Sequence, residues 1–320
     1  MNKVHVLKNS HQAQRKGIMK RSSLLLLTTC YLLFGCSNSD SQELQIDREN
    51  VDITQEEPPV VSDPDDQDYW NDAELIWSDE FDEESISEEN WVFETGGGGW
   101  GNAELQNYQD TGNAVVSDGT LKITAKRNTD NTIEGAFTSA RMNSKESFRY
   151  GRMEIRAKMP EHKGNGLWPA IWMLGSNIQA VGWPACGEID IMEYVSYKPN
   201  KTHFSVHSTA NNHTDGTEIT SGALDLDTIE EEFHNFGVLW SNKYMKFYID
   251  DVDNIQFTFR RPTISNVDSW PFSSNFYFLL NIAVGGTWGG LEGVDTSIFP
   301  ATMEIDYVRV YQVKCCLLYT

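Results

Sequence analysis

The sequence is poor in basic residues and lacks the cysteine spacings that characterise other classes of protein. Of its 25 Lys and Arg residues, only 19 lie beyond residue 35, where they face 47 Asp and Glu residues. Such an acidic surface repels nucleic acid and anionic lipid, so we expect no nucleic-acid partner and consider a neutral polymer a compatible ligand. The five cysteines include no Cys-x-x-Cys spacing, so the sequence predicts neither a cysteine metal site nor a disulfide framework.

The first seventy residues have the composition of an export signal and a tether. Lys20-Arg21 precedes an apolar run, too short to span a membrane, that ends in Leu33-Phe34-Gly35-Cys36. This ending resembles a bacterial lipobox, so we predict a signal peptide over 1–35 and a lipid anchor on Cys36, at the outer membrane or cell surface. The alternative is plain secretion. Residues 36–72 are rich in Ser, Asp, Glu and Pro, and this composition predicts a disordered acidic linker.

From residue 73 onward the hydrophobic periods are those of β-strands. Charged and apolar residues alternate over Arg152–Met159. Apolar and polar residues alternate over Leu121–Lys126, which follows the turn pair Asp118-Gly119. Only Leu226–Phe233 favours a short helix. We therefore predict one all-β domain over 73–313, a sandwich or barrel, followed by a short tail over 314–320.

Three carboxyl groups crowd the segment Gly187-Glu-Ile-Asp-Ile-Met-Glu193. In a regular strand Glu188 and Asp190 share one face, while Glu193 points to the opposite, apolar side. Burying Glu193 there would cost several kcal/mol. A β-bulge near Ile191–Met192 removes the conflict by returning Glu193 to the face of the other two carboxyls. We predict that bulge.

Carboxyls crowded on one face raise each other's pKa, and glycoside hydrolysis uses such a pair as nucleophile and acid. The alternatives are a solvated acidic face or a cation site. Aromatic residues near the segment favour sugar binding, because flat rings cover the apolar faces of sugars. Trp168 and Trp172 share a strand face with Ala170 between them, and Trp288 lies between two glycine pairs.

Several motifs together resemble one family. Gly187–Glu193 resembles the signature of glycoside hydrolase family 16, and segments in the same order and spacing resemble its bacterial laminarinases: Asp79–Phe81, Gly101–Gln106, Tyr150–Lys158, Trp168–Trp172, Trp183–Gly187 and Glu304–Tyr311. The resemblance covers about residues 74–312. It implies a curved β-jelly roll with a concave glucan cleft, and hydrolysis with retention of configuration.

The resemblance also implies residue roles. Glu188 matches the nucleophile, Glu193 the acid/base, and Asp190 the carboxylate that assists them. Six further residues match cleft positions: Asn102, Arg141, Trp168, Trp172, Trp183 and His207. Three match a structural calcium site on the convex face: Glu80, Gly119 and Asp306. Catalysis itself needs no cofactor.

These features favour a monomeric endo-β-1,3-glucanase acting on a laminarin-like polysaccharide. A mixed-linkage glucanase, another family specificity and a non-catalytic glycan-binding lipoprotein remain open. Both glutamates are present, which favours the enzyme. His203 and His207 share a strand face, but no third ligand with metal-site spacing follows them, so the sequence predicts no zinc site.

Overall fold

A computed structural model describes residues 63–66 and 68–314 of the chain. The predicted signal peptide, the Cys36 anchor and most of the linker and tail lie outside these residues. Within them, Cys186 is a buried free thiol.

Two sheets form the folded unit, and all their strand pairs are antiparallel except β3 with β6. The first sheet runs in the order β16 (Ile255–Arg260), β15 (Tyr244–Ile249), β14 (His234–Trp240), β8 (Gly151–Lys158), β18 (Ala301–Val313), β5 (Thr120–Arg127), β6 (Phe137–Ser139) and β3 (Gln106–Tyr108), with β1 (Ala73–Asp79) beside β18 and β4 (Ala114–Ser117) beside β5. The second runs in the order β12 (Ile219–Thr220), β11 (Lys201–His207), β10 (Glu188–Glu193), β9 (Leu167–Gly175), β17 (Phe276–Val284), β7 (Arg141–Ser144) and β2 (Trp91–Glu94), with β13 (Leu224–Asp225) beside β11.

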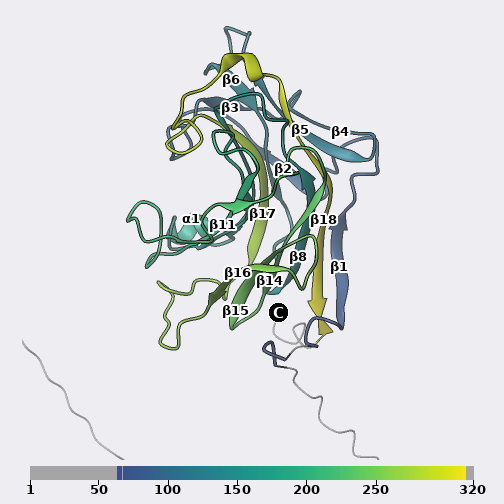
Figure 1. Ribbon diagram of the computed structural model, residues 1–320, viewed down its shortest axis with the longest axis vertical. Coiled ribbons are helices and arrows are strands. Elements are labelled where there is room, and N and C mark those ends of the chain that lie inside the picture. Colours follow the sequence, from purple (N-terminus) through teal and green to yellow (C-terminus); the bar gives the residue numbers. More distant parts are fainter. Residues whose placement is uncertain (1–62, 67, 315–320) are drawn as a thin grey trace, which may run out of the picture. The chain divides into compact units, whose positions relative to one another are not determined.

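The sheets lie face to face as a β-jelly-roll sandwich, and one hydrophobic core fills the space between them (Figure 1). The alternation in β8 is confirmed, since its residues are buried and half-buried in turn. In β15 the alternation is incomplete, because Tyr244 and Tyr248 on the outer face are buried as well. Trp70 covers that face and donates a hydrogen bond from Nε1 to the Tyr244 hydroxyl at 3.0 Å.

The Trp70 contact also corrects one predicted boundary. The linker was expected to stay disordered up to residue 72, but Tyr69 is 5% exposed, and residues 68–72 form turns. Two aromatic residues at this point have enough apolar area to attach the segment to the sheet. The folded unit therefore begins before β1.

The helical elements within the described residues are α1 (Ile178–Val181) and the 3₁₀ turn η1 (Thr296–Ile298). The helix predicted over Leu226–Phe233 is wrong. That segment forms successive turns. The burial of Ile229 and the contact of Thr228 Oγ1 with His234 Nε2, at 2.9 Å, hold these turns against the sheet. No helix in the described part has the length and apolar character needed to cross a membrane.

Gly187, directly before β10, has no space for a side chain. Its φ is +82°, and a Cβ there would lie 2.8 Å from both the Phe276 ring and Pro271. We expect Gly187→Ala to lower the free energy of unfolding by roughly 2–5 kcal/mol through backbone strain and overpacking. Denaturant titration measures this. Gly112→Ala is the control, because Gly112 has φ +77° but open space around it, and should lose only about 1–2 kcal/mol. Equal losses would contradict the packing argument.

Candidate active site

The second sheet carries the candidate site on the face turned away from the core. In β9, Trp168, Ala170 and Trp172 line a cavity, while the alternating residues Leu167, Ile171 and Met173 enter the core, as the period of two predicts. In β10, Glu188 and Asp190 line the same cavity, and Ile189 and Ile191 are fully buried behind them. The expected shared face of the two tryptophans is confirmed.

The predicted bulge in β10 is present. Asp190 pairs with Trp172 of β9 and Glu193 pairs with Ala170, so two residues, Ile191 and Met192, lie opposite the single residue between those partners. The register with β11 shifts over the same interval. Glu193 consequently lines the cavity beside Glu188, while Met192 is fully buried. The extra residue thus places both glutamates on one face without burying a carboxylate in the core.

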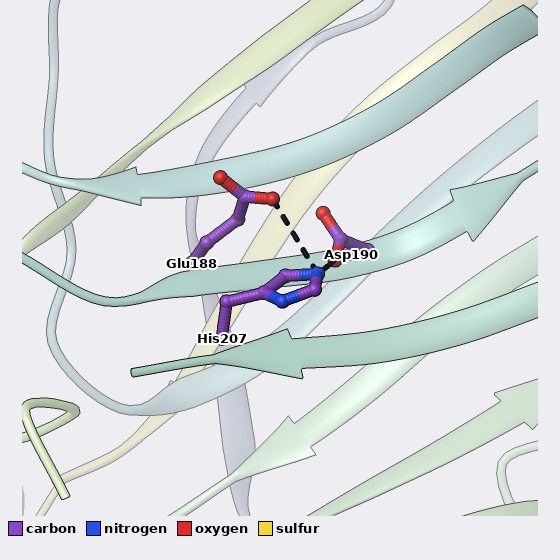
Figure 2. A group of neighbouring side chains, drawn as sticks. All are labelled: Glu188, Asp190 and His207. Atoms are coloured by element: carbon purple, nitrogen blue, oxygen red, sulfur yellow. Dashed lines mark ion pairs between the residues drawn. The ribbon is translucent and has the colours of Figure 1, made fainter. Parts of the chain in front are cut away.

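A histidine from the neighbouring strand completes the acidic cluster. His207 of β11 is the register partner of Glu188, and one nitrogen of its ring faces the carboxyl groups of Glu188 and Asp190 (Figure 2). Its Nε2 lies 3.2 Å from Asp190 Oδ2 and 3.7 Å from Glu188 Oε1. Asp190 is 3% exposed, and its Oδ2 has no well-aligned hydrogen-bond donor.

Burial raises the pKa of all three carboxyl groups. The pKa of Glu188 rises to about 8, first through desolvation and then through the neighbouring Asp190 charge, while His207 and the Trp183 N–H oppose the rise. Desolvation also raises the pKa of Asp190 to about 8. Desolvation, reinforced by the charges of both neighbours, raises the pKa of Glu193 as well. A raised pKa keeps the proton on this carboxyl, which fits a general acid.

Indole N–H groups fix both glutamates. Trp183 Nε1 donates to Glu188 Oε2 at 3.0 Å, and Trp168 Nε1 donates to Glu193 Oε1 at 3.2 Å. Ser205 Oγ donates a longer bond to Glu193 Oε2 at 3.4 Å. Each glutamate is thus oriented by a ring that also forms part of the cleft wall.

Arg141 contacts two tryptophan rings of the cleft wall. Its guanidinium carbon lies 5.0 Å from the centre of the Trp100 ring and 4.8 Å from that of Trp172. Its Nε pairs with Glu94. Such a cation between two ring faces holds both indoles in place.

A buried chain of hydrogen bonds supports Trp172 from behind. Trp172 Nε1 donates to Asn281 Oδ1 at 2.8 Å, and Asn281 donates to the Tyr108 hydroxyl at 3.0 Å. Tyr108 donates in turn to Glu104 at 3.3 Å, a carboxylate that also accepts from Asn102. Since these donors and acceptors satisfy one another, the wall is preorganised for a ligand.

The cleft consists of two lobes that meet at the glutamates. One has a volume of about 390 Å³ and contains Asp190, Arg141 and Trp172; the other, of about 410 Å³, contains His207 and Trp288. Five residues line both: Asn102, Trp168, Glu188, Glu193 and His213. A chain of sugars could therefore extend to either side of the carboxyl pair.

All nine residues predicted for catalysis or substrate binding line these lobes, and their roles stay predictions. Sequence reasoning missed other wall residues, among them Trp100, Glu104, His213 and Asn281. Glu104 lies within the Gly101–Gln106 motif and could have been found from it. Asn281 had no such signal, because its place depends on the pairing of β17 with β9.

Two of the three predicted calcium ligands, Glu80 and Asp306, have other partners. Glu80 accepts two hydrogen bonds from Arg309, at 3.0 and 2.7 Å, and Asp306 pairs with Arg156. Calcium prefers six to eight oxygen ligands, and these carboxylate oxygens already contact cations. The side chains as they lie do not fit a calcium ion, and the calcium site stays a prediction.

A pair of carboxyl groups at the centre of an aromatic-lined cleft, on one face of a β-sandwich, is the arrangement of a glycoside hydrolase. The comparisons with known proteins give the family. The profile of Glycosyl hydrolases family 16 matches residues 102–309, and the chain belongs to that family.

Its relatives agree in sequence and fold. A beta-glucanase of Rhodothermus marinus is 44% identical over 250 residues, which are 75% of this chain and 85% of that protein. The structure of a laminarinase from Flavobacterium sp. UMI-01 is 43% identical and covers 75% of this chain and all of its own, with a TM-score of 0.67. The structure of the laminarinase from Rhodothermus marinus is 41% identical and covers 75% of this chain and 97% of its own, with a TM-score of 0.70.

The charge of Asp190 should set the pH range of the site. Because that charge raises the pKa of both Glu188 and Glu193, we expect Asp190→Asn to move both limbs of the pH profile of kcat/KM to lower pH. We also expect kcat to fall by about 10²-fold. Asp190→Glu, which keeps the charge, should lose activity without that shift. An unchanged profile in Asp190→Asn would show that Asp190 is neutral when the enzyme works.

Proposed function

We propose that the protein is a retaining endo-hydrolase of β-1,3-glucan. The observation that carries the proposal is the position of Glu188 and Glu193 at the junction of two cleft lobes. A polymer lying through both lobes presents an internal bond to the glutamates, whereas a cleft closed on one side would accept only chain ends. The names of the relatives, laminarinase and beta-glucanase, support the substrate class.

In the first step, the Glu188 carboxylate attacks the anomeric carbon while the Glu193 carboxyl transfers its proton to the glycosidic oxygen. The glycosidic bond breaks, the shortened glucan leaves with the proton, and a covalent glycosyl ester of Glu188 remains. In the second step, ionised Glu193 removes a proton from water as that water attacks the same carbon. The ester bond breaks, and two inversions give a product of retained configuration.

Product analysis on four polysaccharides tests the proposal. Laminarin, mixed-linkage β-glucan, agarose and carrageenan are each incubated with the full chain, and the oligosaccharides are identified by size and linkage. We expect laminarin to give a ladder of β-1,3-linked products whose new reducing ends are first β. Faster cleavage of mixed-linkage glucan would assign that specificity instead. Binding of laminarin without products from any of the four would identify a glycan-binding protein.

We also propose that the protein is exported and anchored through a lipid on Cys36. The basic start, the short apolar run and the ending Leu33-Phe34-Gly35-Cys36 support this. In cells labelled with radioactive palmitate, the protein should carry the label and fractionate with membranes. Cys36→Ser should lose both properties, whereas Cys30→Ser should keep them. Labelling that persists in Cys36→Ser would contradict the anchor.

A further inference from the structure

The acidic cluster has the ligands of a transition-metal site. Glu188, Asp190 and His207 each offer one ligand atom, and these atoms all lie within 4.8 Å of one another. They converge from two adjacent strands, so no metal-site spacing was visible in the sequence (Figure 2). Among the described residues, this is the one such group of three or more His, Cys, Asp or Glu side chains.

Two of the ligand separations are close to those around a bound zinc ion. Zinc bonds of about 2.0–2.2 Å in tetrahedral coordination place ligand atoms roughly 3.4 Å apart. His207 Nε2 lies 3.2 Å from Asp190 Oδ2 and 3.7 Å from Glu188 Oε1, so small rotations would suffice.

The surroundings of Asp190 also favour a cation there. Its side chain is 3% exposed and aimed into the group, and its Oδ2 accepts no aligned hydrogen bond although His207 Nε2 lies 3.2 Å away. Buried oxygens without a hydrogen bond are uncommon because their desolvation is uncompensated. A divalent ion would bind this oxygen together with the His207 nitrogen and neutralise two carboxylates that repel each other.

We propose that Glu188, Asp190 and His207 form an inhibitory site for a transition-metal dication of the zinc or copper class. One imidazole and two carboxylates suit these ions, whereas calcium and magnesium require more oxygen ligands. Because the metal occupies the nucleophile, it excludes productive binding of glucan; this consequence rests on the proposed function.

Calorimetric titration of the full chain with zinc tests the site itself. We expect one zinc ion per chain, an affinity at least about 10-fold weaker in His207→Gln, and an unchanged affinity in His162→Gln. His162 is exposed and lies outside both cleft lobes, which makes it the matched control for surface histidines. Cobalt in place of zinc should give visible absorption bands of a four-coordinate ion in the parent chain and not in His207→Gln.

Laminarin hydrolysis tests the inhibition. Zinc should raise the apparent KM at unchanged kcat, chelation should reverse this, and calcium should have no such effect. Should His207→Gln unfold, Asp190→Asn takes its place, with the melting temperature of each variant recorded. Zinc binding without hydrolysis of any glucan would reject the enzyme and keep the metal site. Hydrolysis with no zinc bound, or equal binding in His207→Gln and the parent chain, would overturn the metal site alone.

Discussion

Glu188→Ala should lower kcat on laminarin by at least about 10⁴-fold, because no other side chain can take over the attack on the anomeric carbon. Substrate binding should change little, since the aromatic wall of the cleft stays in place. Steady-state rates and the laminarin affinity of the variant measure the two effects separately. Turnover within 10-fold of the parent chain would remove Glu188 from the role of nucleophile.

Azide distinguishes a lost nucleophile from a disturbed fold. In Glu188→Ala a small anion can enter the vacated space and attack in place of the carboxylate, while Glu193 still protonates the leaving oxygen. With an activated β-laminaribioside and azide, we expect a glycosyl azide of inverted, α configuration, because only one displacement occurs. A β-glycosyl azide would contradict the assignment.

Glu188→Gln should also change stability in a particular direction. The pKa of Glu188 rises from about 4.3 in the unfolded chain to about 8 in the folded one, so the folded state binds more protons between these values. Its stability then falls as the pH rises through that window. Removal of the charge should raise the melting temperature at pH 8 by roughly 2–8 °C and leave it nearly unchanged at pH 4. A lower melting temperature at pH 8 would indicate that Glu188 supports the fold.

Glu193→Ala should lose activity in a way that depends on the leaving group. On laminarin, whose leaving sugar needs a proton, we expect kcat to fall by about 10²–10⁴-fold. On an aryl glycoside with a dinitrophenolate leaving group the first step needs no acid, so that step should be nearly as fast as in the parent chain. The pH profile of the variant should also lack the limb at high pH, since the acid with the raised pKa is gone.

Azide again identifies the role. In Glu193→Ala the glycosyl ester of Glu188 still forms from the activated substrate, and azide attacks it without needing a general base. The expected product is a β-glycosyl azide, of retained configuration after two displacements. Equal losses on laminarin and on the aryl glycoside would show that Glu193 is not the general acid.

The catalytic strand could be predicted in unusual detail because its constraints are local. Side chains alternate along any strand, so the order of carboxyl and apolar residues from Glu188 to Glu193 was compatible with an all-β fold only if a bulge intervened. The same reasoning placed Trp168 and Trp172 on one face. It failed for Leu226–Phe233, where the burial of Ile229 favoured turns over a helix, a preference that comes from packing.

By itself, then, the sequence determined the all-β character of the domain, the three carboxyls and the bulge that gathers them, since each depends on neighbours within a few residues. Only the tertiary structure decided which side chains meet them. The Nε2 of His207 faces both Glu188 and Asp190 because β11 pairs with β10 in one register, and Arg141 reaches Trp172 because β7, β17 and β9 are adjacent. Strand order and register depend on the packing of the whole core, and no local pattern encodes them.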